Sequence, residues 1–173
     1  MDVLEAIRGR RSIRAFKSQE ISEEIVEKLI DAAIWAPSAG NIQPWEFIIV
    51  RKPEIKRGLA EAALDQSFIE EAPVVIVVCA NETRSSQGYG MRGKTLYCIQ
   101  DTAAAIQNLH LAACSFGLGT CWIGAFKEEE AREILKIPYG IRPVAIIPVG
   151  YAAETPSPRS RRPKSEIVHY ETF

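Results

Sequence analysis

The chain has 173 residues, of which 47% are hydrophobic and 25% charged, and its formal net charge is −1. Those values are typical of a soluble globular protein, and the length predicts one domain covering residues 1–173. Near-neutrality argues against a general nucleic-acid or membrane-surface role, and no apolar run is long enough to span a bilayer. The acidic N-terminus has no targeting pattern, so we expect a cytoplasmic protein.

The predicted elements are amphipathic helices and short apolar strands. Ser22 is suited to cap a helix whose apolar face includes Ile25, Leu29 and Ala33 at i,i+4 spacing. Segment 73–79 is β-branched and apolar on both faces, so we expect it in the middle of a covered sheet. The other expected elements are a short helix breaking near Ser12, a strand at 46–50, a helix from Pro53, a helix at 95–116, a strand at 120–123, a helix at 128–136 and a strand at 143–151. The pattern predicts an α+β fold with a mixed central β-sheet flanked by helices.

The C-terminal stretch 152–173 is expected to be an extended arm. Its prolines exclude a helix, yet it ends in the β-prone segment Ile167–Tyr170. About twenty residues at roughly 3.3 Å each span a whole subunit. We therefore expect the arm to be exchanged across a homodimer and to join a sheet edge there, with folding back on its own subunit as the alternative.

No side chain in the sequence has the setting of a nucleophile, a general base or a metal ligand. The four cysteines lack metal-ligand spacing and are interpreted as buried, reduced thiols. His110 is interpreted as a core residue, and Asp101 is expected to hydrogen-bond the backbone or a hydroxyl. Segment 88–93 formally matches GxGxxG, but its strand ends too far upstream and no acidic residue follows at the ribose-binding distance. We interpret this segment as a flexible loop.

Three polar segments are candidates for ligand binding. Arg10, Arg11 and Ser12, followed by Arg14, offer guanidinium groups and a hydroxyl for one phosphate, and a second arginine cluster occupies 159–162. Two solvated basic faces are the alternative interpretation. The turn-rich segment 37–45 has polar side chains suited to a planar polar ligand, although it is equally interpretable as a helix stop before a strand.

Five motifs occur in order: Arg-Arg-Ser-x-Arg at 10–14, Pro-Ser-Ala-Gly-Asn-x-Gln-Pro-Trp at 37–45, Gln-Asp-Thr-Ala-Ala at 100–104, Gly-Leu-Gly-Thr-Cys-Trp-Ile-Gly-Ala-Phe at 117–126, and the arginine-rich segment 159–163. Together they cover nearly the whole chain. The sequence resembles the FMN-dependent nitroreductase and flavin oxidoreductase family, as a compact member.

The resemblance implies a homodimer with FMN at the subunit interface, NADH or NADPH as the electron donor, and a small-molecule acceptor such as a nitroaromatic or a quinone. Hydride would reach flavin N5 and leave to the acceptor in a ping-pong scheme. The implied FMN-binding residues are Arg10, Arg11, Ser12, Arg14, Pro37, Ser38, Ala39, Asn41, Gln66, Gly124, Ala125, Arg159 and Arg161.

The implied roles divide these residues between two subunits. The arginines and Ser12 would hold the phosphate, with Arg14 nearer the ribityl chain and the N1–O2 edge of the ring. The turn at 38–41 of the other subunit would line the flavin, and Gly124 and Ala125 would present backbone groups to N5. A flavin carrier or sensor without turnover and an arginine-rich nucleic-acid binder are the competing functions.

Overall fold

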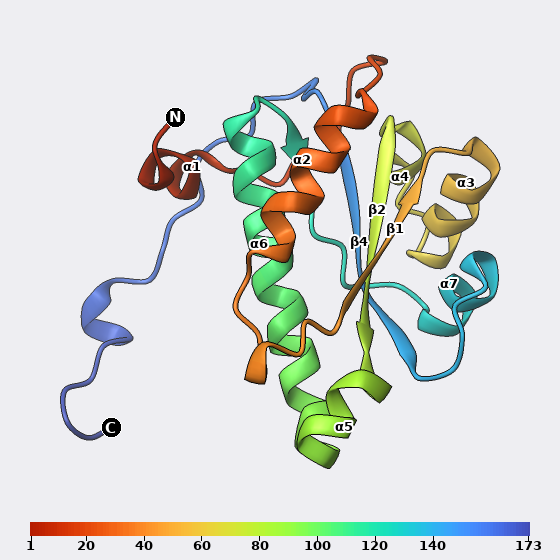
Figure 1. Cartoon of the computed structure of the whole chain (residues 1–173). Coiled ribbons are helices and arrows are strands. Elements are labelled where there is room, and N and C mark those ends of the chain that lie inside the picture. The colour runs from red at the N-terminus through yellow and green to blue at the C-terminus, as the bar shows by residue number, and fades with distance from the viewer.

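The computed structural model describes residues 1–173 as a four-stranded sheet between two layers of helices (Figure 1). The helices are α1 (Val3–Gly9), α2 (Glu23–Ile34), α3 (Pro53–Ala62), α4 (Phe68–Glu71), α5 (Glu82–Arg92), α6 (Cys98–Ser115) and α7 (Glu128–Leu135). The strands are β1 (Trp45–Val50), β2 (Val74–Asn81), β3 (Gly119–Thr120) and β4 (Ile141–Gly150). None of the helices combines the length and apolarity that crossing a lipid bilayer requires.

The sheet has the strand order β1-β2-β4-β3, and all neighbouring strands are antiparallel. At its β3 edge, Ser12 forms a parallel bridge with Thr120, which makes the sheet mixed as predicted. Strand β2 lies inside the sheet, where Val77 pairs with Ile48 on one side and Ile146 on the other. The α+β prediction and the central position of segment 73–79 are confirmed.

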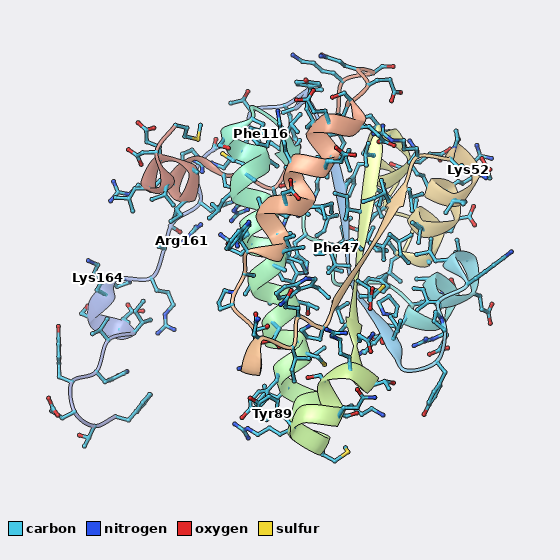
Figure 2. All side chains as sticks on the ribbon, viewed as in Figure 1. Phe47, Lys52, Tyr89, Phe116, Arg161 and Lys164 are labelled. Atoms are coloured by element: carbon cyan, nitrogen blue, oxygen red, sulfur yellow. The ribbon has the colours of Figure 1, made fainter.

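Each face of the sheet has its own hydrophobic core because alternate β2 side chains point to opposite sides. Val74, Ile76 and Val78 pack with α2 and α6, whereas Val75 and Val77 pack with α3, α4 and α7. Figure 2 shows the side chain of Phe47, from β1, among the apolar side chains between sheet and helices. This packing fixes α6 lengthwise against the sheet, and both candidate ligand-binding regions are attached to α6.

The prediction of a flexible loop at 88–93 was wrong, since most of this segment belongs to α5. The helix forms despite its serines and glycines because tertiary contacts outweigh local propensity. Asn81 caps its start by accepting a hydrogen bond from the Arg84 amide at 2.9 Å, and the Ser85 hydroxyl donates to the Gly93 carbonyl at 3.0 Å. Gly90, with φ +54° and ψ −140°, kinks the end of α5 before the π-helical segment Gly93–Tyr97.

One strand prediction also needs correction, and the predicted exchange of the arm stays a prediction. The strand expected at 120–123 is only two residues long, and Ile123 reaches the sheet through an isolated bridge to Ile146. Segment 167–170 forms no strand within the subunit and instead follows a short 3-10 turn at Lys164–Glu166. The arm leaves the body of the molecule with Arg161 and Lys164 along its length (Figure 2). Its apolar end is therefore exposed.

Candidate functional site: an arginine cradle and a strained turn

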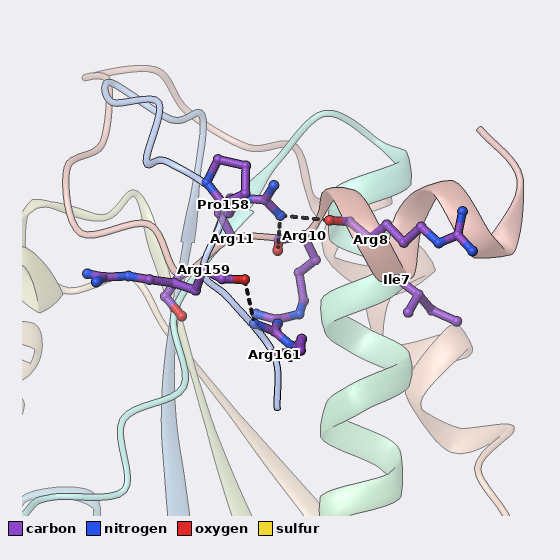
Figure 3. A pocket seen from close by; sticks show the side chains of 8 residues that line it. Ile7, Arg8, Arg10, Arg11, Pro158, Arg159 and Arg161 are labelled. Carbon is purple, nitrogen blue, oxygen red and sulfur yellow. Dashed lines mark hydrogen bonds between the residues drawn. The ribbon is translucent and has the colours of Figure 1, made fainter. Parts of the chain in front are cut away.

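The two predicted arginine clusters meet in one pocket at the surface of the subunit (Figure 3). The pocket has a volume of about 410 Å³, and we call it the arginine cradle. Its lining residues are Ile7, Arg8, Arg10, Arg11, Ser12, Pro158, Arg159 and Arg161. Both ends of the chain contribute to it, so the predicted convergence of the clusters is present within a single subunit.

Pairing between residues 14–17 and residues 151–154, the terminal seam, brings the chain ends together. The Lys17 amide donates to the Tyr151 carbonyl at 2.8 Å, the Ala153 amide donates to the Ala15 carbonyl at 2.9 Å, and the Arg14 amide donates to the Glu154 carboxylate. The seam fixes the start of the arm, and the next few residues then reach the cradle. Sequence reasoning missed Glu154, because an acidic residue at the start of a proline-rich arm resembles any surface carboxylate.

The cradle holds cationic side chains without counter-ions. Arg11 Nη1 donates to the carbonyl oxygens of Arg8 at 2.7 Å and of Gly9 at 3.0 Å, at the C-terminal end of α1. Arg161 Nη1 donates to the carbonyl oxygens of Arg159 and Ser160. No arginine that lines the cradle forms a salt bridge with a carboxylate. Since close guanidinium groups repel one another, an anion is the natural occupant, and a phosphate monoester such as that of FMN matches this donor set.

A second pocket of about 340 Å³ adjoins the cradle and contains Arg14. It shares Arg11, Ser12 and Arg159 with the cradle, and Glu154 lies on its wall. The Arg14 guanidinium carbon lies 6.0 Å from the centre of the Phe68 ring. Arg14 thus lies beside the arginine cradle. Its predicted role at the ribityl chain and the N1–O2 edge of the flavin stays a prediction.

Behind the cradle, the buried His110 of α6 supports the segment that carries Ser12. His110 Nδ1 lies 2.7 Å from Thr120 Oγ1, and the Thr120 carbonyl accepts the Ile13 amide at 2.9 Å. Burial lowers the pKa of His110 to about 4, and the charge of Arg10 acts in the same direction. The imidazole is therefore neutral at pH 7, which agrees with its interpretation as a core residue, although its Nε2 has no hydrogen-bond partner.

The thiols offer no nucleophile at this site. Cys121 is buried, and burial raises the pKa of its thiol against the opposing influence of Arg14. Cys79 and Cys98 are buried as expected, whereas Cys114 is half-buried, and all four cysteines are free. Burial also raises the pKa of the Cys79 and Cys98 thiols, so none of the three buried cysteines is suited to act as a nucleophile.

The turn at residues 37–43, here called the Asn41 turn, is held by a set of specific hydrogen bonds. Ser38 Oγ accepts the Gln43 amide at 3.0 Å, and Gln43 Nε2 donates to Asn41 Oδ1 at 3.1 Å. Gly40, Asn41 and Gln43 have φ angles of +56°, +55° and +54°. Such left-handed conformations are unfavourable for the two non-glycine residues, so the surrounding bonds must maintain them.

Within one subunit, the Asn41 turn and the arginine cradle lie near opposite ends of α6 (Figure 1). Asp101, in the first turns of the helix, accepts the Ala39 amide at 3.1 Å. Cys114, near the other end, lies 3.9 Å from the sulfur of Met1 beside α1. Thirteen residues at 1.5 Å each separate these two points by about 20 Å along α6. The structure therefore does not bring the Asn41 turn into the cradle of its own subunit.

The remaining predicted residues form a third group. Gln66 Nε2 donates to the Ala63 carbonyl at 2.8 Å and lies 3.4 Å from the Ala125 carbonyl, which links the predicted Gln66 and Ala125. An added Cβ at Gly124 would make only an ordinary van der Waals contact, with Trp122 Nε1 at 3.7 Å, so no tight packing surrounds this glycine. A ligand is therefore able to approach the backbone closely here.

Comparison with known proteins assigns the family. The profile described as "Nitroreductase family" matches residues 7–68 and 63–151. An Archaeoglobus fulgidus protein, provisionally named NADH dehydrogenase/NAD(P)H nitroreductase, is 40% identical over 98% of this chain and 90% of its own length. The "FMN reductase (NADPH)" of Bacillus subtilis is 30% identical over 99% of this chain and 74% of its own.

The solved structures agree with the sequence comparison. Nitroreductase A from Vibrio parahaemolyticus superposes with a TM-score of 0.92 at 28% identity, over 100% of this chain and 77% of that one. Part of that longer chain lies outside the alignment, which agrees with the expectation of a compact member. The sequence, the sheet with its two helical layers, and the family match together establish that this chain belongs to the nitroreductase family.

Proposed function

We propose that this protein is an FMN-dependent NAD(P)H oxidoreductase in which residues 1–173 form a single flavin-binding domain. The observation that carries the proposal is the arginine cradle, a pocket of about 410 Å³ that is lined by arginines from both ends of the chain, none of which has a carboxylate partner. Relatives named FMN reductase and NADH dehydrogenase support both the cofactor and the nicotinamide donor. The enzyme takes electrons from NADH or NADPH and passes them to a small organic acceptor.

The chain's own residues bind and orient the cofactor. Arg10, Arg11 and Ser12, with Arg159 and Arg161, hold the phosphate by charge-assisted hydrogen bonds. Arg14, beside them, stabilises negative charge at the pyrimidine edge of the reduced ring. Ring orientation falls to the Asn41 turn, with Pro37 fixing its entry and Ser38, Ala39 and Asn41 facing the ring.

The groups around Gln66 complete the proposed site. Gln66 supplies an amide near the pyrimidine edge. Gly124 and Ala125 admit a close backbone approach to the ring, since Gly124 has no side chain of its own. When bound, FMN supplies the hydride-accepting and electron-donating chemistry in two successive half-reactions, so the proposal assigns no catalytic role to a side chain. We propose quinones and nitroaromatics as the acceptor classes.

A homodimer reconciles the two distant halves of the site. Because the Asn41 turn and the cradle are about 20 Å apart along α6, one flavin takes its phosphate contacts from one subunit and its ring contacts from the other. The exposed arm end, including Ile167 and Tyr170, then has an apolar surface to bury on the partner. We therefore keep the proposal that the arm of each subunit packs against the other subunit.

The experiment is direct. The purified protein should be yellow or should take up added FMN, and anaerobic NADH or NADPH should bleach the flavin absorbance, which a quinone or nitroaromatic then restores. Protein that stays colourless in excess FMN contradicts the proposal. Flavin that is bound but not bleached by either nicotinamide favours a carrier or sensor, and binding to DNA or RNA with a steep salt dependence favours the nucleic-acid alternative.

A further inference from the structure

Asp101 is an unusual residue for its place in the molecule. It is 7% exposed on α6, whose other inward-facing residues are mostly apolar. No cationic side chain pairs with it, and its only hydrogen-bond donor is the backbone amide of Ala39. Its Oδ2 atom is buried and has no partner. A buried carboxylate with a single neutral donor lowers the stability of the fold, so its presence calls for a function.

The amide that Asp101 holds belongs to the Asn41 turn, 62 residues away in the sequence. Ala39 begins the 3-10 turn Ala39–Asn41, and the backbone enters the left-handed region immediately afterwards, at Gly40 and Asn41. An acceptor fixed at this amide sets the direction in which the turn starts. Because α6 is packed along its length against the sheet, the carboxylate is a rigid anchor for an otherwise strained segment.

Other contacts support the same turn from outside but leave its start free. Arg84 Nε donates to the Ile42 carbonyl at 2.6 Å, and the Tyr89 side chain lies over Gly40. Both belong to α5, which also carries the Gly90 kink, and 42% of Tyr89 is exposed. Asp101 is therefore the one contact that ties the start of the turn to the buried core.

We infer that Asp101 is a positioning residue, which orients the Asn41 turn toward the flavin ring by accepting the Ala39 amide. The inference rests on the proposed function and deepens it, because the turn has a catalytic consequence only if FMN is bound against it. The role depends on the acceptor oxygen and not on the negative charge. A neutral side chain with an oxygen in the same place should therefore replace it.

The test uses the holoenzyme and compares Asp101→Ala, Asp101→Asn and a matched control, Asn108→Ala. Asn108 also lies on α6 and also ties it to a distant backbone group, since its Nδ2 donates to the Ala32 carbonyl of α2 at 3.2 Å, but it does not touch the turn. The measurements are the FMN dissociation constant, the visible circular dichroism of the bound flavin, and kcat and KM for NADH with a quinone.

We expect Asp101→Ala to raise the FMN dissociation constant at least tenfold and to change the flavin dichroism. Asp101→Asn should stay within about threefold of the wild type in dissociation constant and kcat, and Asn108→Ala within twofold. A dissociation constant within twofold of the wild type in Asp101→Ala overturns the inference. So does equal weakening in Asn108→Ala, which would indicate that any loss of α6 packing has this effect.

A second substitution keeps the inference testable if Asp101→Ala does not fold. Ala39→Pro removes the donor while leaving α6 intact, and proline suits the first position of a helical turn after the extended Ser38, whose ψ is 154°. We expect the FMN dissociation constant to rise at least tenfold, as it does in Asp101→Ala. A folded Ala39→Pro protein whose FMN dissociation constant stays within twofold of the wild type overturns the inference. If the wild-type protein binds no FMN, the result contradicts the proposed function, and the inference about Asp101 is contradicted together with it.

Discussion

The two halves of the proposed flavin site are built in contrasting ways. The arginine cradle is lined mainly by long charged side chains from the two chain ends, and most of the arm, which supplies two of its five arginines, is exposed. The Asn41 turn is a backbone structure with three left-handed residues, anchored to α6 through Asp101. The contrast teaches that the two tasks of the proposed site have different requirements. Charged side chains are able to retain the cofactor phosphate without precise placement, whereas the chemistry of the flavin ring needs contacts of fixed geometry.

Removing the arm should have the largest effect, because it deletes three of the eight residues that line the cradle. Truncation after Tyr151 eliminates Arg159, Arg161 and the Glu154 end of the terminal seam. We expect protein that is purified without FMN and dimerises poorly, as measured by the flavin-to-protein absorbance ratio and by light scattering.

A shorter truncation after Pro163 is the matched control for this experiment. It keeps both arginines and the seam but deletes the exposed apolar end at 167–173. We expect FMN to be retained while dimerisation weakens. If the protein truncated after Tyr151 were still a dimer with bound flavin, the arm would be unnecessary for either half of the site.

Acidification should weaken the support behind the cradle through His110. The unfolded chain binds a proton below about pH 6.5, whereas burial keeps the folded imidazole neutral down to a pKa of about 4. The unfolded state thus binds more protons in this window, and stability falls as the pH decreases from 6.5 to 4, by about 3 kcal/mol from this residue. The free energy of unfolding, measured by denaturant titration at several pH values, should decrease less on acidification in His110→Gln than in the wild type. An equal pH dependence in the two proteins would contradict the argument from the burial of His110.

Arg11→Ala should weaken the cradle without abolishing it. The substitution removes a charge-assisted phosphate contact worth about 1.5–3 kcal/mol, so the FMN dissociation constant should rise roughly tenfold to a hundredfold. Arg57→Ala is the control, because Arg57 is exposed and pairs only with Glu70. Unchanged flavin occupancy in Arg11→Ala, measured by equilibrium titration, argues against the phosphate assignment.

Gly40→Ala should have the smallest effect, on the Asn41 turn. An added Cβ would lie 2.6 Å from the Tyr89 hydroxyl, and the φ of +56° is unfavourable for alanine. We expect a loss of about 1 kcal/mol in thermal stability together with a lower kcat. Adding Tyr89→Ala to the Gly40→Ala variant should remove the steric contact with the tyrosine hydroxyl but not the cost of the positive φ angle at residue 40. Gly9→Ala, where an added Cβ meets no atom within 4 Å, should leave stability unchanged or slightly higher.

The sequence was sufficient for the parts of the molecule that depend on local pattern. The apolar run at 73–79 predicted the central strand β2, Ser22 proved to cap α2, and Pro53 begins α3. The convergence of the two arginine clusters was one of two alternatives, the other being two separate solvated basic faces. It was predicted because a shared phosphate would balance the positive charges at the two chain ends. These features are set by side-chain type and spacing, which a single sequence displays.

Features that depend on distant contacts were missed. Helix α5 has poor helix formers and is stabilised by its Asn81 cap and by the hydrogen bond from Ser85, within the helix, to the Gly93 carbonyl. The end of the arm is β-prone, yet a strand there needs an edge that its own subunit does not give it. The expectation that Asp101 hydrogen-bonds the backbone is confirmed, but its partner Ala39, 62 positions away, was not identified from the sequence.

The terminal seam has a consequence for biosynthesis. The Arg14 amide is bonded to a carboxylate 140 positions later, and the cradle is complete only once Arg161 is present. A nascent chain on the ribosome therefore has the Asn41 turn and strands β1 and β2 well before it has a complete phosphate site. We expect ribosome-bound chains that are arrested before Arg161 emerges to retain no FMN.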